Sequence, residues 1–211
     1  MMRIESVATQ PDRAGRYTVK FEDGSILRLY RQTVQDFSLY SGKELRDEEV
    51  NQLHNAAGQM SAKMRAVRIV SASSISTADL ERRLIQKGEN KTDAHQAVAW
   101  MTDLNLLDDQ KTAEQVVHRC ISKGLGLARA KQALYEKRIP RELWDEVLSD
   151  YPDQTDKILA FLKIRLGDSR EEKDLRKATD ALLRRGHSYQ EIRAALRELS
   201  CEADFQEDVY G

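Results

Sequence analysis

The chain has 211 residues, of which 40% are hydrophobic and 33% are charged. No run approaches the roughly 18 to 20 consecutive apolar residues that a bilayer-spanning helix needs, and the first residues lack the apolar core of a secretory signal. Cys120 and Cys201 stand without the CxxC spacing of a zinc ribbon, and we interpret both as free thiols. These features argue against a membrane or secreted protein and predict a cytoplasmic location.

The charges nearly cancel over the whole chain but not along it. There are 34 basic and 35 acidic side chains, which excludes a histone-like polycation. Residues 63–200 carry 26 basic and 22 acidic groups, whereas the last eleven residues carry four acidic groups and no basic one. Only ten Gly and three Pro interrupt a sequence rich in helix formers, so we expect a mostly helical protein with a mildly basic centre.

The first thirty residues predict a small antiparallel sheet. Apolar and polar side chains alternate over residues 17–21, Asp23-Gly24 comes next, and an apolar and aromatic run covers residues 26–30. Alternation around Asp-Gly is a strong hairpin signal, because the turn needs positive φ at its centre. Residues 4–8 are a candidate third strand.

Two helical segments are expected to link this sheet to the rest of the chain. The first begins after residue 31, and the second begins near Asp47, where an acidic first turn suits the positive end of the helix dipole. A polar stretch over residues 51–61 then separates this leader from the later helices. We therefore expect a truncated chain that begins near residue 56 to remain folded.

Beyond about residue 56 one pattern recurs three times, at offsets of 50 and 48 residues. In each copy a helix ends on basic residues, a short turn comes after it, and Asn90, Pro140 or Ser188 opens the next helix. Tandem units of this kind bury their apolar stripes on their neighbours. The aligned segments are residues 84–90, 134–140 and 182–188, and the helices predicted before them lie near residues 57–73, 109–122 and 154–166.

These patterns predict a mainly α fold of three tandem three-helix repeats in an elongated, curved array, preceded by a small N-terminal antiparallel β-sheet. The expected segments are a β-hairpin leader with a helical connector (1–55), repeat one (56–107), repeat two (108–151), repeat three (152–200) and an acidic tail (201–211).

Four groups of residues carry a family resemblance. They are residues 66–71 with 76–84 and 87–88, residues 104–109 with Ala113, residues 123–126 with 137–140, and residues 41–45 of the leader. The first three groups resemble the opening helix pair, the Leu-Asp-Asp linker and the borders of the second repeat in the RecX family, which modulates the bacterial recombinase RecA. The leader is similar to that of longer Gram-positive members.

The resemblance implies a non-enzymatic regulator that lodges in the helical groove of a RecA filament on single-stranded DNA. Bound there, it would restrain ATP hydrolysis, strand exchange and the co-protease activity that triggers the SOS response, and so regulate DNA repair and homologous recombination. We expect a monomer with weak nucleic-acid binding and no membrane partner. The chain departs from the family in its neutral residues 72–75, in Thr112 for an aromatic residue and in Arg138 for a glycine.

The candidate catalytic and metal-binding residues favour structural interpretations, so no cofactor or metal is expected. Residues 124–126 are too short for a phosphate-binding loop and lack its lysine and hydroxyl, which favours a helix–helix turn. Asp108 and Asp109 can be read as an acid–base or Mg²⁺ pair, but caps of the next helix are favoured. The four histidines are scattered, which disfavours zinc. Trp100 and Trp144 sit on apolar stripes, which favours core burial over base stacking.

Basic side chains on the second helix of each repeat, or at its end, are the candidate partner- or DNA-facing residues. A solvated face and stabilisation of helix C-termini are the plain meanings of such charges. Recurrence in three units equally favours one positive surface that meets a polyanion or an acidic groove. We expect Arg82, Arg83, Lys137, Arg138, Arg184 and Arg185 to be exposed. The full candidate set is Arg82, Arg83, Lys87, Arg129, Lys131, Lys137, Arg138, Arg176, Lys177, Arg184 and Arg185.

A helix-turn-helix-like protein that acts on DNA directly is the alternative interpretation, because three-helix units resemble modules whose short helix enters a major groove. Recognition helices usually present polar reading residues in their first turn. Lys91, Arg141 and Tyr189 at the corresponding positions form no repeating set. The sequence therefore favours the filament-binding regulator.

Overall fold

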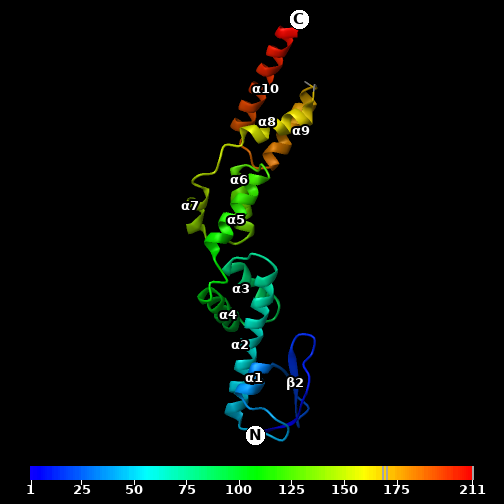
Figure 1. Ribbon diagram of the computed structural model, residues 1–211, viewed down its shortest axis with the longest axis vertical. Coiled ribbons are helices and arrows are strands. Elements are labelled where there is room, and N and C mark those ends of the chain that lie inside the picture. The colour runs from blue at the N-terminus through cyan, green and yellow to red at the C-terminus, as the bar shows by residue number, and fades with distance from the viewer. Residues whose placement is uncertain (168, 170, 211) are drawn as a thin grey trace. The chain divides into compact units, whose positions relative to one another are not determined.

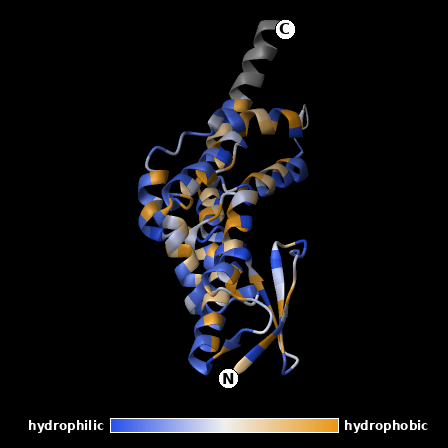
Figure 2. Cartoon of the chain, turned by 60° about the horizontal axis from the view of Figure 1, so that its bottom comes forward, coloured by the Kyte–Doolittle hydropathy of each residue, from blue (hydrophilic) through white to orange (hydrophobic). Residues whose placement is uncertain are grey.

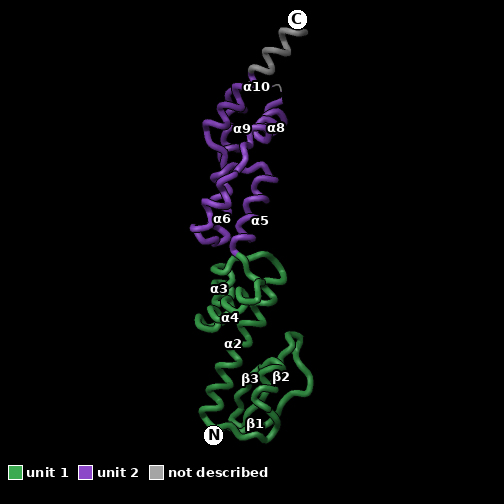
Figure 3. Tube along the Cα trace, turned by 60° about the vertical axis from the view of Figure 1, so that its left-hand side comes forward, with its two compact units in different colours: residues 1–108 green, residues 109–211 purple. Residues whose placement is uncertain are grey.

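The computed structural model describes residues 1–167, 169 and 171–210, with side chains up to residue 200. The chain divides into two compact units, residues 1–108 and 109–211 (Figure 3). Helices dominate both units, and one small antiparallel sheet precedes them, so the predicted fold class is confirmed (Figure 1). Across the described residues, no helix combines the length and apolarity that membrane crossing requires.

The N-terminal sheet has four strands in the order β3-β2-β1-β4, and every neighbouring pair is antiparallel. The predicted hairpin is present, since the strands on either side of Asp23-Gly24 pair antiparallel. In its turn, Gly24 adopts a φ of 85° and the Asp23 carboxylate accepts hydrogen bonds from Ser25. The sequence did not predict the fourth strand, because its two residues are too few to show a periodic pattern. The strands are β1 (Met2–Val7), β2 (Arg16–Phe21), β3 (Ile26–Tyr30) and β4 (Glu44–Leu45).

Two helices come after β3, with β4 between them. Helix α1 (Arg31–Asp36) is short, and α2 (Asp47–Ala72) begins at the residue that the acidic first turn predicted. Helix α2 runs for 26 residues and crosses residue 56, where we expected the leader to end. Leu53 of α2 is fully buried in the core of the sheet. The leader therefore shares a continuous helix with repeat one, and the expected division into segments stays a prediction.

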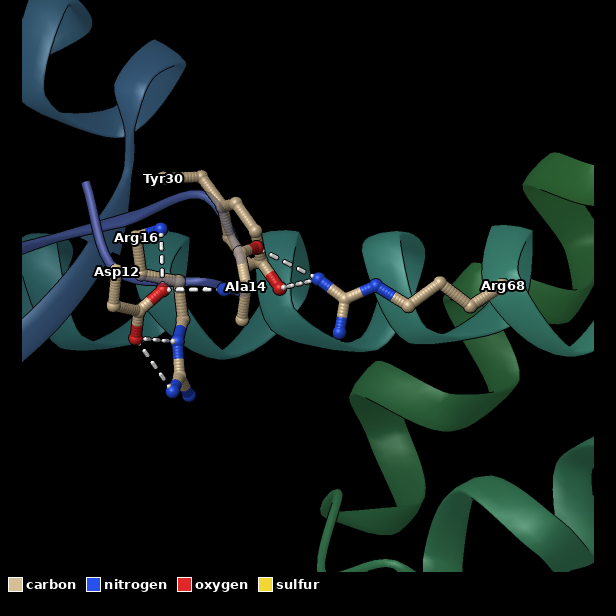
Figure 4. Close-up of polar contacts among 5 residues, drawn as sticks. All are labelled: Asp12, Ala14, Arg16, Tyr30 and Arg68. Carbon is tan, nitrogen blue, oxygen red and sulfur yellow. Dashed lines mark hydrogen bonds and ion pairs between the residues drawn. The ribbon is translucent and has the colours of Figure 1, made fainter.

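Polar contacts extend this attachment along α2 (Figure 4). The Arg68 Nη2 atom donates to the carbonyl oxygen of Ala14 at 2.8 Å and to the Tyr30 hydroxyl at 2.9 Å. Within the loop between β1 and β2, the Asp12 carboxylate accepts hydrogen bonds from the Arg16 backbone and guanidinium. These bonds lower the pKa of Asp12. Arg68 thus links both the β1–β2 loop and Tyr30 of β3 to helix α2, which continues into repeat one.

The repeats match the predicted offsets. The second helices end at Gln86, Glu136 and Arg184, and the third helices begin five residues later, so both boundaries shift by 50 and then 48 residues. Repeat one contains α2, α3 (Thr77–Gln86) and α4 (Lys91–Asp103). Repeat two contains α5 (Asp109–Ser122), α6 (Leu127–Glu136), the 3₁₀ turn η1 (Arg141–Leu143) and α7 (Trp144–Leu148). Repeat three contains α8 (Thr155–Leu166), α9 (Glu172–Arg184) and α10 (Tyr189–Tyr210).

The helix starts use the residues that the sequence indicated. The Asn90 side chain accepts from the amide of Asp93 at 2.7 Å, and Ser188 and Glu191 exchange the two bonds of a capping box. Pro140 provides no side-chain cap, and the helix after it opens as a 3₁₀ turn. The backbone of α10 continues into the segment predicted as an acidic tail, whose side chains, including Cys201, lie outside the described residues.

Each repeat has its own apolar core. Leu84, Leu134 and Leu182 occupy the same position in the three units, and each is fully buried. Hydrophilic and hydrophobic residues intermingle along the helices in Figure 2, so the helices carry apolar stripes rather than being apolar all round.

Candidate partner-binding surface

The turn after the second helix has the same backbone in all three repeats. Gly88, Arg138 and Gly186 take φ values of 92°, 55° and 87°. In each turn the amide of this residue bonds to the carbonyl three residues back, and the next amide bonds back to the carbonyl of the buried leucine, as in a Schellman motif. Arg138, which we noted as a replacement for glycine, therefore occupies a left-handed conformation that favours glycine.

The last turn of the second helix carries an exposed apolar side chain in every repeat. Ile85, Tyr135 and Leu183 correspond by the 50- and 48-residue offsets, and they are 41%, 62% and 43% exposed. Each lies one residue after the buried leucine and therefore points away from the core side of its helix. Each repeat therefore presents an exposed apolar side chain at one shared position.

A basic residue caps the same helices. Lys87, Lys137 and Arg185 are the C-cap residues of α3, α6 and α9. A positive charge there is favourable because it faces the negative end of the helix dipole. Of the predicted basic surface, this is the position that repeats at the same place in all three units.

Other members of the predicted basic set make structural contacts. The Asp79 carboxylate is almost completely buried and is held by Arg82 at 2.7 Å and by Arg83 at 3.0 Å. The side chains of Arg82 and Arg83 are 35% and 39% exposed, so these two residues are less exposed than we expected. The cause is a charge requirement, since a buried carboxylate needs partners to offset its lost hydration.

Arg185 and Arg129 are half-buried as well. The Arg185 guanidinium lies over the ring of Phe161, 5.4 Å from its centre, and donates to the carbonyl oxygen of Lys123 at 2.7 Å. Arg129 pairs with Glu136 at 3.1 Å. Hydrogen bonds from Gln132 and Arg129 lower the pKa of Glu136. Lys137 is also half-buried, and the exposed candidates are Lys87, Lys131, Arg138, Arg176, Lys177 and Arg184.

A groove lies beside the exposed apolar residue in repeat two. It encloses about 320 Å³ between the end of α6 and the start of the third helix. Its lining residues are Tyr135, Glu136, Arg138, Ile139, Arg141 and Trp144.

A second groove of about 510 Å³ lies between α9 and α10 in repeat three. Its lining includes Leu183, Tyr189 and Ile192, which correspond to Tyr135, Arg141 and Trp144 of repeat two. The two grooves therefore occupy one repeat position, with different side chains around them.

The two tryptophans are half-buried, not enclosed by the core as expected. Trp144 packs against the core of repeat two, donates its indole N–H to the carbonyl oxygen of Ile139 at 3.1 Å, and carries the Arg141 guanidinium over its ring at 5.5 Å. Trp100 packs against the core of repeat one, with the Lys63 ammonium over its ring at 5.3 Å. Each ring thus joins the core to a basic group at the surface.

Residues 124–126 form the predicted helix–helix turn, with a φ of 61° at Gly124. They also contact the turn between the second and third helices of repeat three. The Gly126 amide donates to the carbonyl oxygen of Arg185 at 3.0 Å, and the His187 Nε2 atom lies 3.1 Å from the carbonyl oxygen of Gly124. Sequence reasoning missed this junction, because its signal is a pair of glycines distant in the chain.

The other chemical candidates keep structural roles. No group of three or more His, Cys, Asp or Glu side chains within the described residues is arranged to hold a metal ion. Helix α5 begins at Asp109, whose acidic side chain lies in its first turn, near the positive end of the helix dipole. Cys120 is buried, and burial raises the pKa of its thiol.

Comparisons with known proteins agree with this architecture. A family model described as RecX, second three-helix domain, matches residues 108–148. The regulatory protein RecX of Vibrio parahaemolyticus serotype O3:K6 is 27% identical over 143 residues, covering 66% of this chain and 92% of that protein. The regulatory protein RecX of Listeria welshimeri serovar 6b is 22% identical over 214 residues, covering 99% of this chain and 80% of that protein. A crystal structure of regulatory protein RecX aligns with a TM-score of 0.64 at 20% identity, covering 92% of this chain and 100% of the other.

The fold and its repeated surface define a protein of tandem three-helix repeats. The matches to RecX from Vibrio and from Listeria confirm the resemblance that the motifs predicted, including the similarity to longer Gram-positive members. The chain is thus similar to regulatory proteins named RecX over most of its length.

Proposed function

We propose that this chain binds the RecA nucleoprotein filament on single-stranded DNA and restrains its ATP hydrolysis, strand exchange and co-protease activity. It would act in the cytoplasm as a non-enzymatic monomer and so regulate DNA repair and the SOS response. The proposal rests on similarity to regulatory proteins named RecX over most of the chain. We name RecA as the partner because the sequence motifs resemble those of the RecX family.

The observation that carries the proposal is the surface that recurs in register. Each repeat presents an exposed apolar side chain two residues before a basic C-cap, as with Tyr135 and Lys137. A protein filament also repeats one surface along its length. A ligand with several weak, matching contacts gains avidity on such a target, because each later contact forms at a high effective concentration.

The alternative function is direct binding to duplex DNA. The third helices begin with Lys91, Arg141 and Tyr189, and Arg141 stacks on Trp144 rather than extending freely. A repeated reading residue is absent among these three positions. The alternative therefore draws support only from the three-helix architecture.

Binding measurements separate the two functions. We expect the protein to bind single-stranded DNA coated with RecA much more tightly than the same strand bare or a duplex of equal length. Equal affinity for bare duplex and for the coated strand would favour direct DNA binding. The comparison is made at two or more salt concentrations, since phosphate contacts weaken steeply with salt.

A further inference from the structure

The groove of repeat two combines apolar and cationic groups at one place. Tyr135 is 62% exposed at its rim, and Ile139 and Trp144 provide an apolar wall. Arg138 and Arg141 also line it. Its one lining carboxylate, that of Glu136, is already engaged by Arg129 and Gln132. A ligand therefore meets an apolar surface and a net positive rim.

The arginine beside the tryptophan is arranged to recognise a carboxylate. The Arg141 guanidinium lies over the Trp144 ring at 5.5 Å from its centre. Stacking occupies the face of a guanidinium but leaves its N–H groups in the plane free to donate. A planar fork of this kind matches a carboxylate through two parallel hydrogen bonds. Trp144 is itself fixed by its hydrogen bond to Ile139, so the arginine is held in place before a ligand arrives.

The apolar position next to the groove indicates the class of partner. Tyr135 is aromatic, but its counterparts Ile85 and Leu183 are aliphatic and exposed as well. Aromatic rings stack on nucleic-acid bases, whereas aliphatic side chains pack on other apolar side chains. A position that is apolar in all three repeats but aromatic in one suits a protein partner.

The charges around the groove point the same way. Glu142, Asp145 and Glu146, on the helical segment that carries Arg141 and Trp144, lie at or near the surface. A phosphate backbone that runs along this segment would meet these three carboxylates and be repelled. A single carboxylate that enters beside Arg141 avoids them. The local field therefore favours a partner with a localised negative charge.

From this geometry we propose that the groove of repeat two is a docking site for a protein segment that presents a carboxylate beside an apolar side chain. The carboxylate pairs with Arg141 and the apolar side chain packs on Tyr135 at the rim of the groove. This inference rests on the proposed function, in which the segment belongs to the surface of RecA. The face of repeat two that carries the groove is thus the face that meets the protein of the filament, not its DNA.

Two single variants test the groove. Tyr135→Ala removes the apolar contact, and Arg141→Glu reverses the charge that meets the carboxylate. Tyr40→Ala is a matched control, since Tyr40 in the leader is also 62% exposed. Arg119→Glu is the second control, because Arg119 is an exposed arginine on α5 of the same repeat. Circular dichroism and thermal melting establish that each variant is folded.

Binding is measured by fluorescence anisotropy with a labelled oligonucleotide, bare and coated with RecA. We expect each groove variant to weaken binding to the coated strand by about tenfold or more, as for central Tyr and Arg contacts at interfaces. The two control variants should bind the coated strand as the unaltered protein does, and the affinity of every variant for the bare strand should stay unchanged.

If the groove variants bind the coated strand as the unaltered protein does, the docking site is wrong. An equal loss on the bare strand would assign the groove to nucleic acid and also overturn the inference. If the unaltered protein fails to bind the coated strand, the proposed function itself is wrong.

Discussion

Gly126 and Gly186, in the turns of two successive repeats, approach so closely that neither position has room for a Cβ atom. A Cβ at Gly126 would collide with the carbonyl oxygen of Gly186, and one at Gly186 would collide with the backbone amide of Arg129. The Gly126 amide donates to the carbonyl oxygen of Arg185 at 3.0 Å, beside this contact. Repeats two and three are therefore joined backbone to backbone.

Alanine at the two corresponding glycines should have unequal effects. Gly88→Ala meets open space and costs only the positive φ, about 1 kcal/mol. Gly186→Ala adds a collision with backbone and should lower the unfolding midpoint in urea much further. Equal shifts of the urea midpoint for the two variants would show that the backbone around Gly186 moves to accommodate a Cβ atom at little cost.

Arg138→Gly should stabilise the protein. Arg138 has a φ of 55°, which costs an L-residue free energy that glycine does not pay. We expect a gain of up to about 1 kcal/mol in the free energy of unfolding, reduced by the loss of the arginine's own contacts and by the greater entropy that glycine gives the unfolded chain. Chemical unfolding of the protein measures it. A lower stability would mean that those contacts outweigh the backbone strain.

Much of this architecture could be predicted because it depends on local patterns. The Asp23-Gly24 turn, the acidic start at Asp47 and the 50- and 48-residue offsets each depend on residues close together in the chain, and each is confirmed. The contact between Gly126 and Gly186 joins residues far apart in the sequence, and no local or periodic pattern of residues indicates it.

The candidate surface was only partly predictable for a related reason. A basic residue looks alike in sequence whether it faces water or a buried carboxylate. Arg82 and Arg83 form ion pairs with the buried Asp79 carboxylate, whereas Lys87 is exposed. Likewise, the long helix α2 carries no breaker that stops it at residue 56, and the only glycine there, Gly58, makes room for the Asp93 carboxylate.

Charge reversal should separate these two kinds of arginine. Arg82→Glu with Arg83→Glu places two carboxylates beside the buried Asp79 and should cost about 2 kcal/mol or more of stability. Reversal of the exposed Lys87 and Arg184 should lower the melting temperature less, because it disturbs only solvated charges that interact with helix C-termini. Calorimetry compares the pairs. Similar melting temperatures would show that Asp79 does not depend on its arginines.

His187 should make the repeat two–three junction sensitive to acid. Burial lowers the pKa of its imidazole below 6.5, although a hydrogen bond with Gly124 and the charge of Glu191 act in the opposite direction. The unfolded chain therefore binds the proton more readily than the folded one, so this contribution to stability is complete above about pH 6.5 and declines as the pH falls below it.

His187→Gln keeps a donor toward Gly124 but cannot titrate in this range. Its melting temperature should fall less between pH 7 and about pH 5.5 than that of the unaltered protein. Measurements in buffers of equal ionic strength check this difference. Parallel curves for the two proteins would place the acid sensitivity elsewhere.

The most direct test of the regulatory account is the rate of ATP hydrolysis by RecA on single-stranded DNA as this protein is titrated in. The account predicts that amounts below one molecule per RecA slow the hydrolysis, and that the protein alone hydrolyses no ATP. An unchanged RecA turnover at saturating protein would contradict the account.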